Sequence, residues 1–301
     1  MRRNNVHPAW VLLIVAADIP ISNFAQVPLT RAMIRLSIFS VIAVIAITCV
    51  NGADPAHLPA DQLAKAIKTD SISIPTPGEL FAALEKPGKI NWSGQYRPPM
   101  PMTYRNRAQI ALNLGGLIAD GFIAVEAKDS QQVKNIGSDI IKLAKALGVS
   151  EHVLSRSNSI NEFAEHNEWD TLQEELEATQ NEVKSSMQSH SDQDLIILVS
   201  LGGWVRGTQV VSAAILENYD EGSAKVLRQP ALIGLMQSKI SEISPELREQ
   251  PLVKDVSQQL KGIQKLVSFP AGKPPSVDDV RKVNEAVGKV MEEIESKTIR
   301  K

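Results

Sequence analysis

The chain has 301 residues, of which 43% are hydrophobic and 22% charged, an ordinary composition for a globular protein and not that of a disordered chain. Its formal net charge of −2 at pH 7 provides no basic footprint, so nucleic acid is excluded as an expected partner. Only 4% of the residues are aromatic, which favours helices packed by aliphatic side chains over a β-sandwich. We therefore expect an all-α protein built as a helical bundle.

An apolar stretch near the N-terminus has the layout of a secretory signal. From Met33 the chain carries one arginine, then a largely apolar run over 36–50, then small residues that allow cleavage after Gly52 or Ala53. The run holds about 15 residues, fewer than the roughly 20 that span a bilayer comfortably. We therefore expect export, with Met33 as the true start of the chain.

That signal sets the expected division of the chain. Residues 1–53 are interpreted as an extension plus a signal peptide, and residues 54–301 as one helical domain that is periplasmic or secreted. An anchor formed by residues 33–53, uncleaved or lipidated at Cys49, is the alternative and the only expected contact with a membrane. Cys49 is the single cysteine, so the mature chain would hold no thiol for a disulfide, a metal or a nucleophile.

Capping residues mark the expected helix starts, at Thr76, Asp129, Ser159, Ser191, Ser244 and Ser276. Together with the apolar periodicity they predict helices near 60–69, 77–86, 104–127, 130–147, 159–189, 192–218, 223–243, 245–267 and 276–299. The last of these carries a single apolar stripe, which should dock on the bundle.

Two of the predicted helices contain adjacent glycines, Gly115 with Gly116 and Gly202 with Gly203. A glycine inside a helix costs roughly 1 kcal/mol relative to alanine, so each pair needs a compensating contact. We expect the two helices to cross at the glycines, where bare backbone allows close approach; a kink, or room for a ligand, is the alternative.

The same two segments suggest an internal repeat. Their apolar positions align at one constant offset, which predicts a duplicated helical hairpin at about 104–147 and 192–243. Chance resemblance between buried aliphatic helices is the alternative. The run 195–216 is apolar enough to pass a crude transmembrane test, but Arg206 near its middle favours a buried helix of a soluble bundle.

Arg206 also predicts a buried ion pair. A crossing at the glycines would bring Asp120 and Arg206 to similar depth, and a buried charge without a partner is strongly disfavoured. We expect Asp120 to pair with Arg206, with Glu126 as the alternative partner. The pair either neutralises the core or takes part in binding a ligand.

The loop before the first long helix is the best candidate for a binding site. This strap, residues 90–107, interleaves three aromatic residues with three arginines and is stiffened by prolines. Aromatic rings beside guanidinium groups suit a flat or anionic ligand. The candidate ligand-binding residues are Trp92, Tyr96, Arg97, Tyr104, Arg105, Arg107, Asp120 and Arg206. Alternatively, the aromatic side chains plug the end of the bundle.

Motifs of known chemistry are missing from the sequence, which has no zinc-protease helix, phosphate-binding loop, nucleophile elbow or dinucleotide fingerprint. We expect no cofactor and no metal site, and interpret the acidic segment 161–183 as a solvated helix face rather than a cation chelate. The preferred function is an exported, non-enzymatic binding or scaffold protein for a small anionic ligand or a protein partner. The alternatives are a protein-interaction bundle of the cell envelope, and a periplasmic enzyme with Asp120, Glu126 and Arg206 in a cleft.

Overall fold

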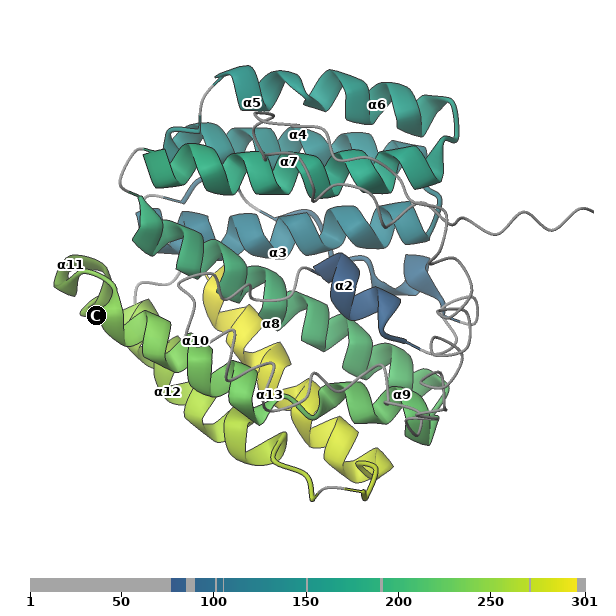
Figure 1. Cartoon of the computed structure of the whole chain (residues 1–301), viewed down its shortest axis with the longest axis vertical. Coiled ribbons are helices and arrows are strands. Elements are labelled where there is room, and N and C mark those ends of the chain that lie inside the picture. The colour runs from purple at the N-terminus through teal and green to yellow at the C-terminus, as the bar shows by residue number, and fades with distance from the viewer. Residues whose placement is uncertain are drawn as a thin grey trace, which may run out of the picture. The chain divides into compact units, whose positions relative to one another are not determined.

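The computed structural model describes residues 77–84, 90–100, 102–104, 106–149, 151–189, 192–270 and 272–296, in which every regular element is helical (Figure 1). The elements are α2 (Pro77–Ala82), η2 (Trp92–Gln95), α3 (Arg107–Glu126), α4 (Ser130–Leu147), α5 (Glu151–Ser155), α6 (Ser157–Glu165), α7 (Trp169–Ser189), α8 (Gln193–Glu217), α9 (Glu221–Ala224), η3 (Lys225–Leu227), α10 (Pro230–Glu242), α11 (Pro245–Arg248), α12 (Pro251–Leu266) and α13 (Val277–Glu295). The signal segment, Cys49 and the helix predicted at 60–69 lie outside the described residues.

Several helices begin and end where local chemistry predicts. Asp129 caps α4 by accepting a hydrogen bond from the Gln132 amide, and the helix ends at Gly148 with a left-handed φ of 88°. Ser276 and Asp279 form a reciprocal capping box at the start of α13. These starts rest on interactions within a few residues, which is why the sequence alone locates them.

Three predicted helices are wrong in their continuity. The segment 159–189 is broken between α6 and α7, where Asn167 adopts a left-handed φ of 60°, and Ser159 lies inside α6 instead of capping a helix. The segments 223–243 and 245–267 restart at Pro230 and Pro251, each at the first position of a new helix. Proline has no amide hydrogen to donate to the preceding turn, so it begins a helix more readily than it continues one.

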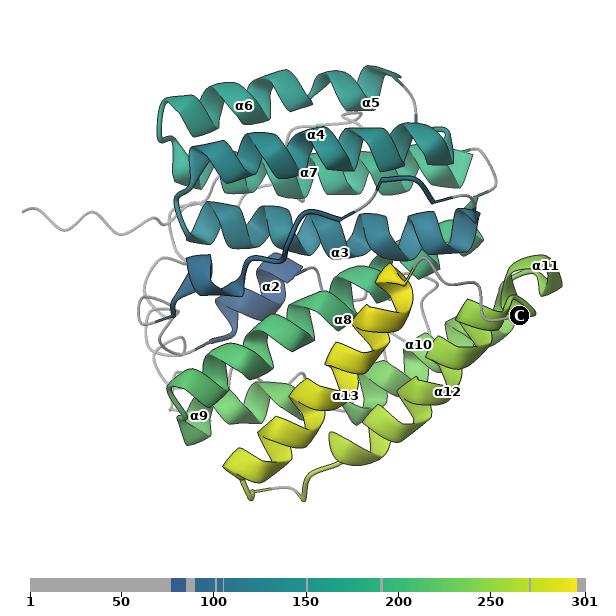
Figure 2. The same cartoon turned by 180° about the vertical axis from the view of Figure 1, so that it is seen from behind.

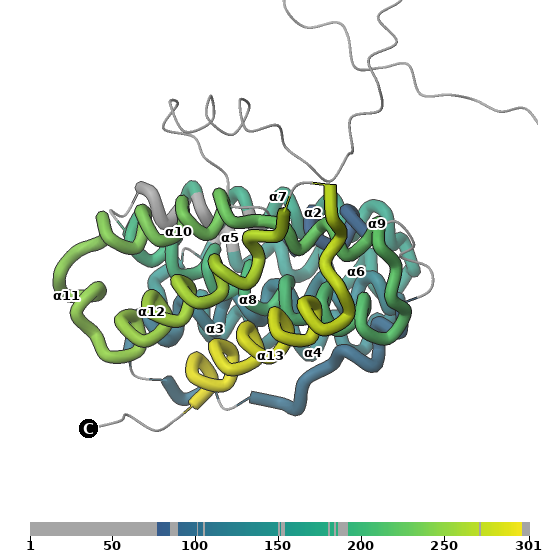
Figure 3. Tube along the Cα trace, turned by 90° about the horizontal axis from the view of Figure 1, so that it is seen from below, coloured from purple at the N-terminus to yellow at the C-terminus, as the bar shows by residue number. Residues whose placement is uncertain are grey.

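The helices form two sets with different directions. Figures 1 and 2 show α3, α4, α6 and α7 running side by side, with α5 and α6 outermost, while α8 crosses α3 obliquely. The second set contains α8, α10, α12 and α13, and α12 packs between α10 and α13 (Figure 3). The most extensive helix contact is between α3 and α8, which therefore form the centre of the bundle.

The last helix docks along its apolar stripe, as its spacing predicts. Val280, Val283, Val287, Val290 and Ile294 are all fully buried, against α8 and α12. The capping box fixes where α13 begins, and the spacing of its apolar residues determines which face meets the core.

Bare backbone at two glycines explains how closely α3 and α8 approach. A Cβ built on Gly115 would lie 1.9 Å from the Val199 carbonyl oxygen, and one on Gly202 would lie 1.9 Å from the Leu112 carbonyl oxygen. No side chain fits at either position, so the expected crossing at the glycine pairs is present. Its backbones are too close to leave room for a ligand there.

The other two glycines have separate neighbours. A Cβ on Gly116 would face Arg97 and Met291, each 3.4 Å away, and not α8. One on Gly203 would lie 3.4 Å from the Gly115 carbonyl oxygen and 3.5 Å from Pro77 of α2. The expectation that all four glycines serve one helix crossing is therefore wrong for Gly116, which makes room for the strap and α13.

Among the described residues, α3 and α8 are long and apolar enough to cross a membrane by length and composition alone. Within the bundle, 89% of the apolar 18-residue stretch of α3 and 78% of the corresponding stretch of α8 are buried. Burial against other helices accounts for their composition, since the core helix of a bundle passes the same test.

Candidate functional site

The strap is fastened to the bundle at its start. Trp92 is buried and lies against Phe81 of α2, with ring centroids 5.1 Å apart. The short helix η2 begins at Asn91, whose side chain accepts a hydrogen bond from the Gly94 amide. These contacts fix the direction in which the next residues, Tyr96 and Arg97, extend along α3.

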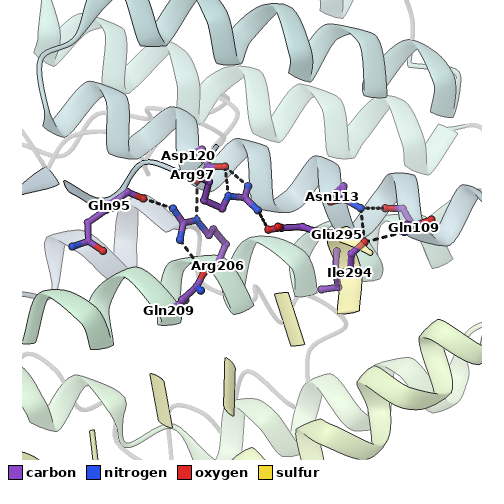
Figure 4. Close-up of polar contacts among 9 residues, drawn as sticks. All are labelled: Gln95, Arg97, Gln109, Asn113, Asp120, Arg206, Gln209, Ile294 and Glu295. Carbon is purple, nitrogen blue, oxygen red and sulfur yellow. Dashed lines mark hydrogen bonds and ion pairs between the residues drawn. The ribbon is translucent and has the colours of Figure 1, made fainter. Parts of the chain in front are cut away.

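A buried ion cluster holds the middle of the strap (Figure 4). Arg97 donates to Asp120 of α3, through Nε at 2.9 Å and also through Nη2, and to Glu295 at the end of α13. The same Asp120 carboxylate accepts a hydrogen bond from Arg206 Nε of α8 at 2.8 Å. One carboxylate therefore joins the strap, α3 and α8, while Glu295 balances the second arginine.

Two further hydrogen bonds hold the Arg206 guanidinium in place. Its guanidinium donates to the Gln209 side chain at 2.8 Å and to the Gln95 carbonyl of the strap (Figure 4). Burial lowers the pKa of Arg206 despite the attraction of Asp120. Burial acts in the same direction on Arg97, but Asp120 and Glu295 outweigh it and raise the Arg97 pKa. Arginine stays charged even so, and the cluster holds two cations and two anions.

The pair of Asp120 with Arg206 predicted from the sequence is present, and the alternative partner is wrong. Glu126 lies six residues after Asp120, about 9 Å along the helix axis and on another side of α3. Burial raises the pKa of the Glu126 carboxyl, although the positive charge of nearby Lys128 acts in the opposite direction. Glu126 therefore lies apart from the pair of Asp120 with Arg206.

A cleft of about 490 Å³ lies where the strap passes over α3 and α4. We call it the strap cleft. From the strap and α3 it is lined by Tyr96, Arg97, Pro98, Pro99, Met100, Leu117 and Asp120. From α4 it is lined by Gln132, Lys134, Asn135, Ile136, Ser138, Asp139 and Lys142. The cleft joins an aromatic ring, apolar surface and charged groups in a volume suited to a small molecule.

Sequence reasoning did not identify the wall formed by α4. Its polar residues recur every four positions, as in Lys134, Ser138 and Lys142, which places them on one face of a helix. Such a face is usually only a solvated surface. This face of α4 becomes a wall of the cleft only because the strap lies opposite it, and helix periodicity does not predict which segment lies opposite a helix face.

The predicted site residues divide into two groups. Tyr96, Arg97 and Asp120 line the strap cleft. The Tyr96 hydroxyl lies 3.4 Å from Asp129, and burial together with this carboxylate raises the pKa of Tyr96 to about 12. Two others do not line it: Trp92 is buried at the start of the strap, and Arg206 lies behind Asp120.

Three further candidates in the strap have other positions. The Tyr104 hydroxyl is buried, and desolvation and the charge of Glu295 raise its pKa. Arg107 is exposed at the start of α3 and pairs with Asp192 at 3.1 Å. Arg105 lies outside the described residues. The interleaved aromatic residues and arginines are therefore split between anchoring the strap and lining the cleft.

The acidic segment 161–183 is partly neutralised within the chain. Arg156 forms a forked pair with Glu175 and also bonds Glu182, and Lys134 pairs with Glu165 at 2.6 Å. Over the described ranges no group of three or more His, Cys, Asp or Glu side chains is arranged to hold a metal ion. The solvated face predicted for this segment therefore also carries ion pairs between helices.

Comparison of the chain with protein families, with curated proteins and with solved structures finds no match.

Proposed function

We propose that the mature chain is a binding protein that holds a small anionic molecule in the strap cleft. The observation that carries the proposal is the composition of the cleft wall, where three cations face two carboxylates beside a tyrosine ring and two prolines. The charges of Arg97 and Asp120 neutralise each other. The two lysines of α4, Lys134 and Lys142, therefore determine which ligand charge the cleft prefers. An anion with a flat or apolar part fits both features.

The two lysines can exchange their present partners at small cost. Lys142 pairs with Asp139 one turn earlier on α4, and more than half of the Lys142 side chain is exposed. Lys134 pairs with Glu165, which is also mostly exposed. Exposed ion pairs contribute at most about 1 kcal/mol, so a bound anion can replace these carboxylates. The buried cluster keeps Arg97 and the strap in place while this happens.

We expect neutralisation of the two α4 lysines to weaken anion binding. The probe is phenyl phosphate, an anion with a flat ring, titrated into the protein while backbone amide chemical shifts are recorded. In the wild type the shifts should concentrate in 94–100 and 132–142. The variant Lys134→Gln/Lys142→Gln should bind at least tenfold more weakly, because it removes two of the three cations of the cleft.

The matched control for that titration is Lys254→Gln/Lys261→Gln on α12. It changes net charge equally, and Lys254 is also an ion-paired lysine, bonded to Glu249 at 2.7 Å. We expect the control to bind like the wild type. Equal weakening of both variants, or shifts centred away from the strap and α4, would show general charge attraction and contradict a site in the cleft.

We also propose that the chain is exported after cleavage near Gly52. Support comes from the charge, length and small-residue pattern that begins at Met33. The intact mass of the protein recovered from the periplasm of a producing bacterium should place the N-terminus at Ala53 or Asp54. Recovery in the membrane fraction with residues 33–53 retained, or with a lipid on Cys49, would instead support the anchored alternative.

We further propose that the hairpins α3–α4 and α8–α10 arose by duplication. The glycine contacts support it: Gly115 meets the carbonyl of Val199, and Gly202 meets the carbonyl of Leu112. In the repeat alignment Leu112 corresponds to Val199 and Gly115 to Gly202, so exchanging the two helices maps the contact onto itself, as in a two-fold interface. The hairpins differ in their connections, which are 127–129 in the first and 218–229 in the second.

A further inference from the structure

A second cavity lies on the other side of α4, away from the strap. It has a volume of about 310 Å³, is partly open to solvent, and is lined by residues of α3, α4, α5, α6 and α7; Figures 1 and 2 show α3, α4, α6 and α7 side by side. Its apolar lining residues are Ile118, Phe122, Val133, Ile140, Ile141, Ala144, Leu154, Ile160, Leu176 and Val183. We call it the apolar cavity. Its volume is at the lower end of the range of small-molecule pockets.

Two glycines in the walls of this cavity have no packing reason to be glycine. A Cβ on Gly137 would meet nothing within 4 Å, and one on Gly121 would make only ordinary contacts, at 3.8 Å to Ile140 and 3.9 Å to Ile136. Each lies inside a helix, where alanine would be more stable by roughly 1 kcal/mol. At Gly115 and Gly202 the close backbones account for that cost, whereas here the absent side chains only keep the cavity open.

The polar groups of the cavity are few and unequal. Lys134, Ser138, Ser157 and Asn161 are at least partly exposed and therefore form its rim, where Lys134 is already paired with Glu165. Thr179 Oγ1, in contrast, is buried and has no hydrogen-bond partner among the described residues. A buried hydroxyl without a partner is costly, so it marks the point in the wall where a ligand could accept or donate a hydrogen bond.

We propose that the apolar cavity binds one small, uncharged, mostly aliphatic molecule that carries a single hydrogen-bonding group. The buried part of the wall is aliphatic, so a charge held there would lack a partner, and Lys134, the cation of the lining, lies at the rim and is paired with Glu165. This site adjoins the strap cleft, with which it shares Lys134 and Ser138 of α4 as lining residues, and its ligand differs in charge from the anion proposed there.

The direct test is to fill the cavity from Gly137. The probe is N-phenyl-1-naphthylamine, whose fluorescence rises in apolar surroundings, displaced by 1-decanol. The full-length mature protein should bind the dye and release it to decanol. Gly137→Leu should reduce the affinity for both at least tenfold, because the new side chain occupies the open space beside α4. Gly137→Ala, which adds one methyl group where nothing lies within 4 Å, should fold normally and reduce it at least twofold.

The matched control is Gly262→Leu on α12, another helix glycine whose Cβ would meet nothing within 4 Å. It gains the same helix propensity but lies outside the cavity lining, so it should bind dye and decanol like the wild type. Absence of binding by the wild type, or equal binding by the Gly137 and Gly262 variants, would overturn the proposal.

Thr179→Val tests the hydrogen-bonding group separately. It keeps the shape of the side chain and removes only the hydroxyl. Displacement by 1-decanol should weaken about fivefold, while displacement by decane should stay unchanged, because decane forms no hydrogen bond. Equal effects on decanol and decane, or none on either, would show that Thr179 does not recognise the ligand.

Discussion

Replacing Gly202 by alanine is expected to lower the free energy of unfolding by about 3 kcal/mol or more. The added methyl group would lie 1.9 Å from the Leu112 carbonyl oxygen, an atom of the backbone that no side-chain rotation can move away. The two central helices must therefore separate along their whole crossing, and the dispersion contacts around it are lost together. Denaturation by urea, followed by circular dichroism, measures the change.

Gly116→Ala is the control for that substitution. It lies on α3 beside the crossing, but its Cβ would stand 3.4 Å from the ends of two side chains, Arg97 and Met291, at the edge of ordinary van der Waals contact. We expect its stability to remain within about 1 kcal/mol of the wild type, because the gain in helix propensity offsets the tighter contact. If both variants lost stability equally, close backbone approach would not be the reason for the glycines.

The second large effect is expected from Asp120→Asn, which should cost about 3 to 5 kcal/mol. Asp120 and Arg206 are both less than a tenth exposed, and Asp120 accepts hydrogen bonds from two arginines. An amide of the same shape leaves two buried guanidinium groups and only one carboxylate in the cluster. That carboxylate, Glu295, contacts Arg97. Breaking a buried pair costs more than the pair contributes, because the remaining charge is not solvated.

Two further variants separate charge from packing. Glu295→Gln removes the other carboxylate of the cluster, but that side chain is 31% exposed, so water can solvate what it leaves and the loss should be much smaller. The double variant Asp120→Asn/Arg206→Met should recover part of the stability lost in Asp120→Asn, since it removes the stranded cation. Equal losses for Asp120→Asn and Glu295→Gln in urea denaturation would contradict the central role given to Asp120.

The sequence predicts those parts of the fold that depend on local or single-residue rules. The cap at Asp129, the box at Ser276 and the cost of glycines inside helices each point to one structural solution, and the crossing follows from the last of these. The breaks at Pro230 and Pro251 were missed although proline is a local signal. There the apolar periodicity continues across the break, because the new helix packs on the same core as the old segment.

The candidate site was only half predictable, for a different reason. Tyr96 and Arg97 are predicted by the alternation of aromatic residues and arginines in the strap, and Asp120 by its place near the glycines of an apolar helix. Lys134 and Lys142 belong to an ordinary polar helix face and become a binding wall only because a distant segment lies opposite. Glu295 completes the ion cluster from the last turn of the last helix, and one sequence holds no signal for a pairing across so much of the chain.

That last turn also affects the order in which the protein can assemble during synthesis. Arg97 meets Glu295 across 198 positions, and the end of α13 is held by Asn113 and Gln109 of α3, which donate to the Ile294 carbonyl. The chain must therefore be synthesised as far as α13 before Arg97 can pair with Glu295, whereas Asp120 and Arg206 can pair earlier. Contacts of such high sequence separation slow folding, so we expect the docking of α13 and the pairing of Arg97 with Glu295 to be late steps.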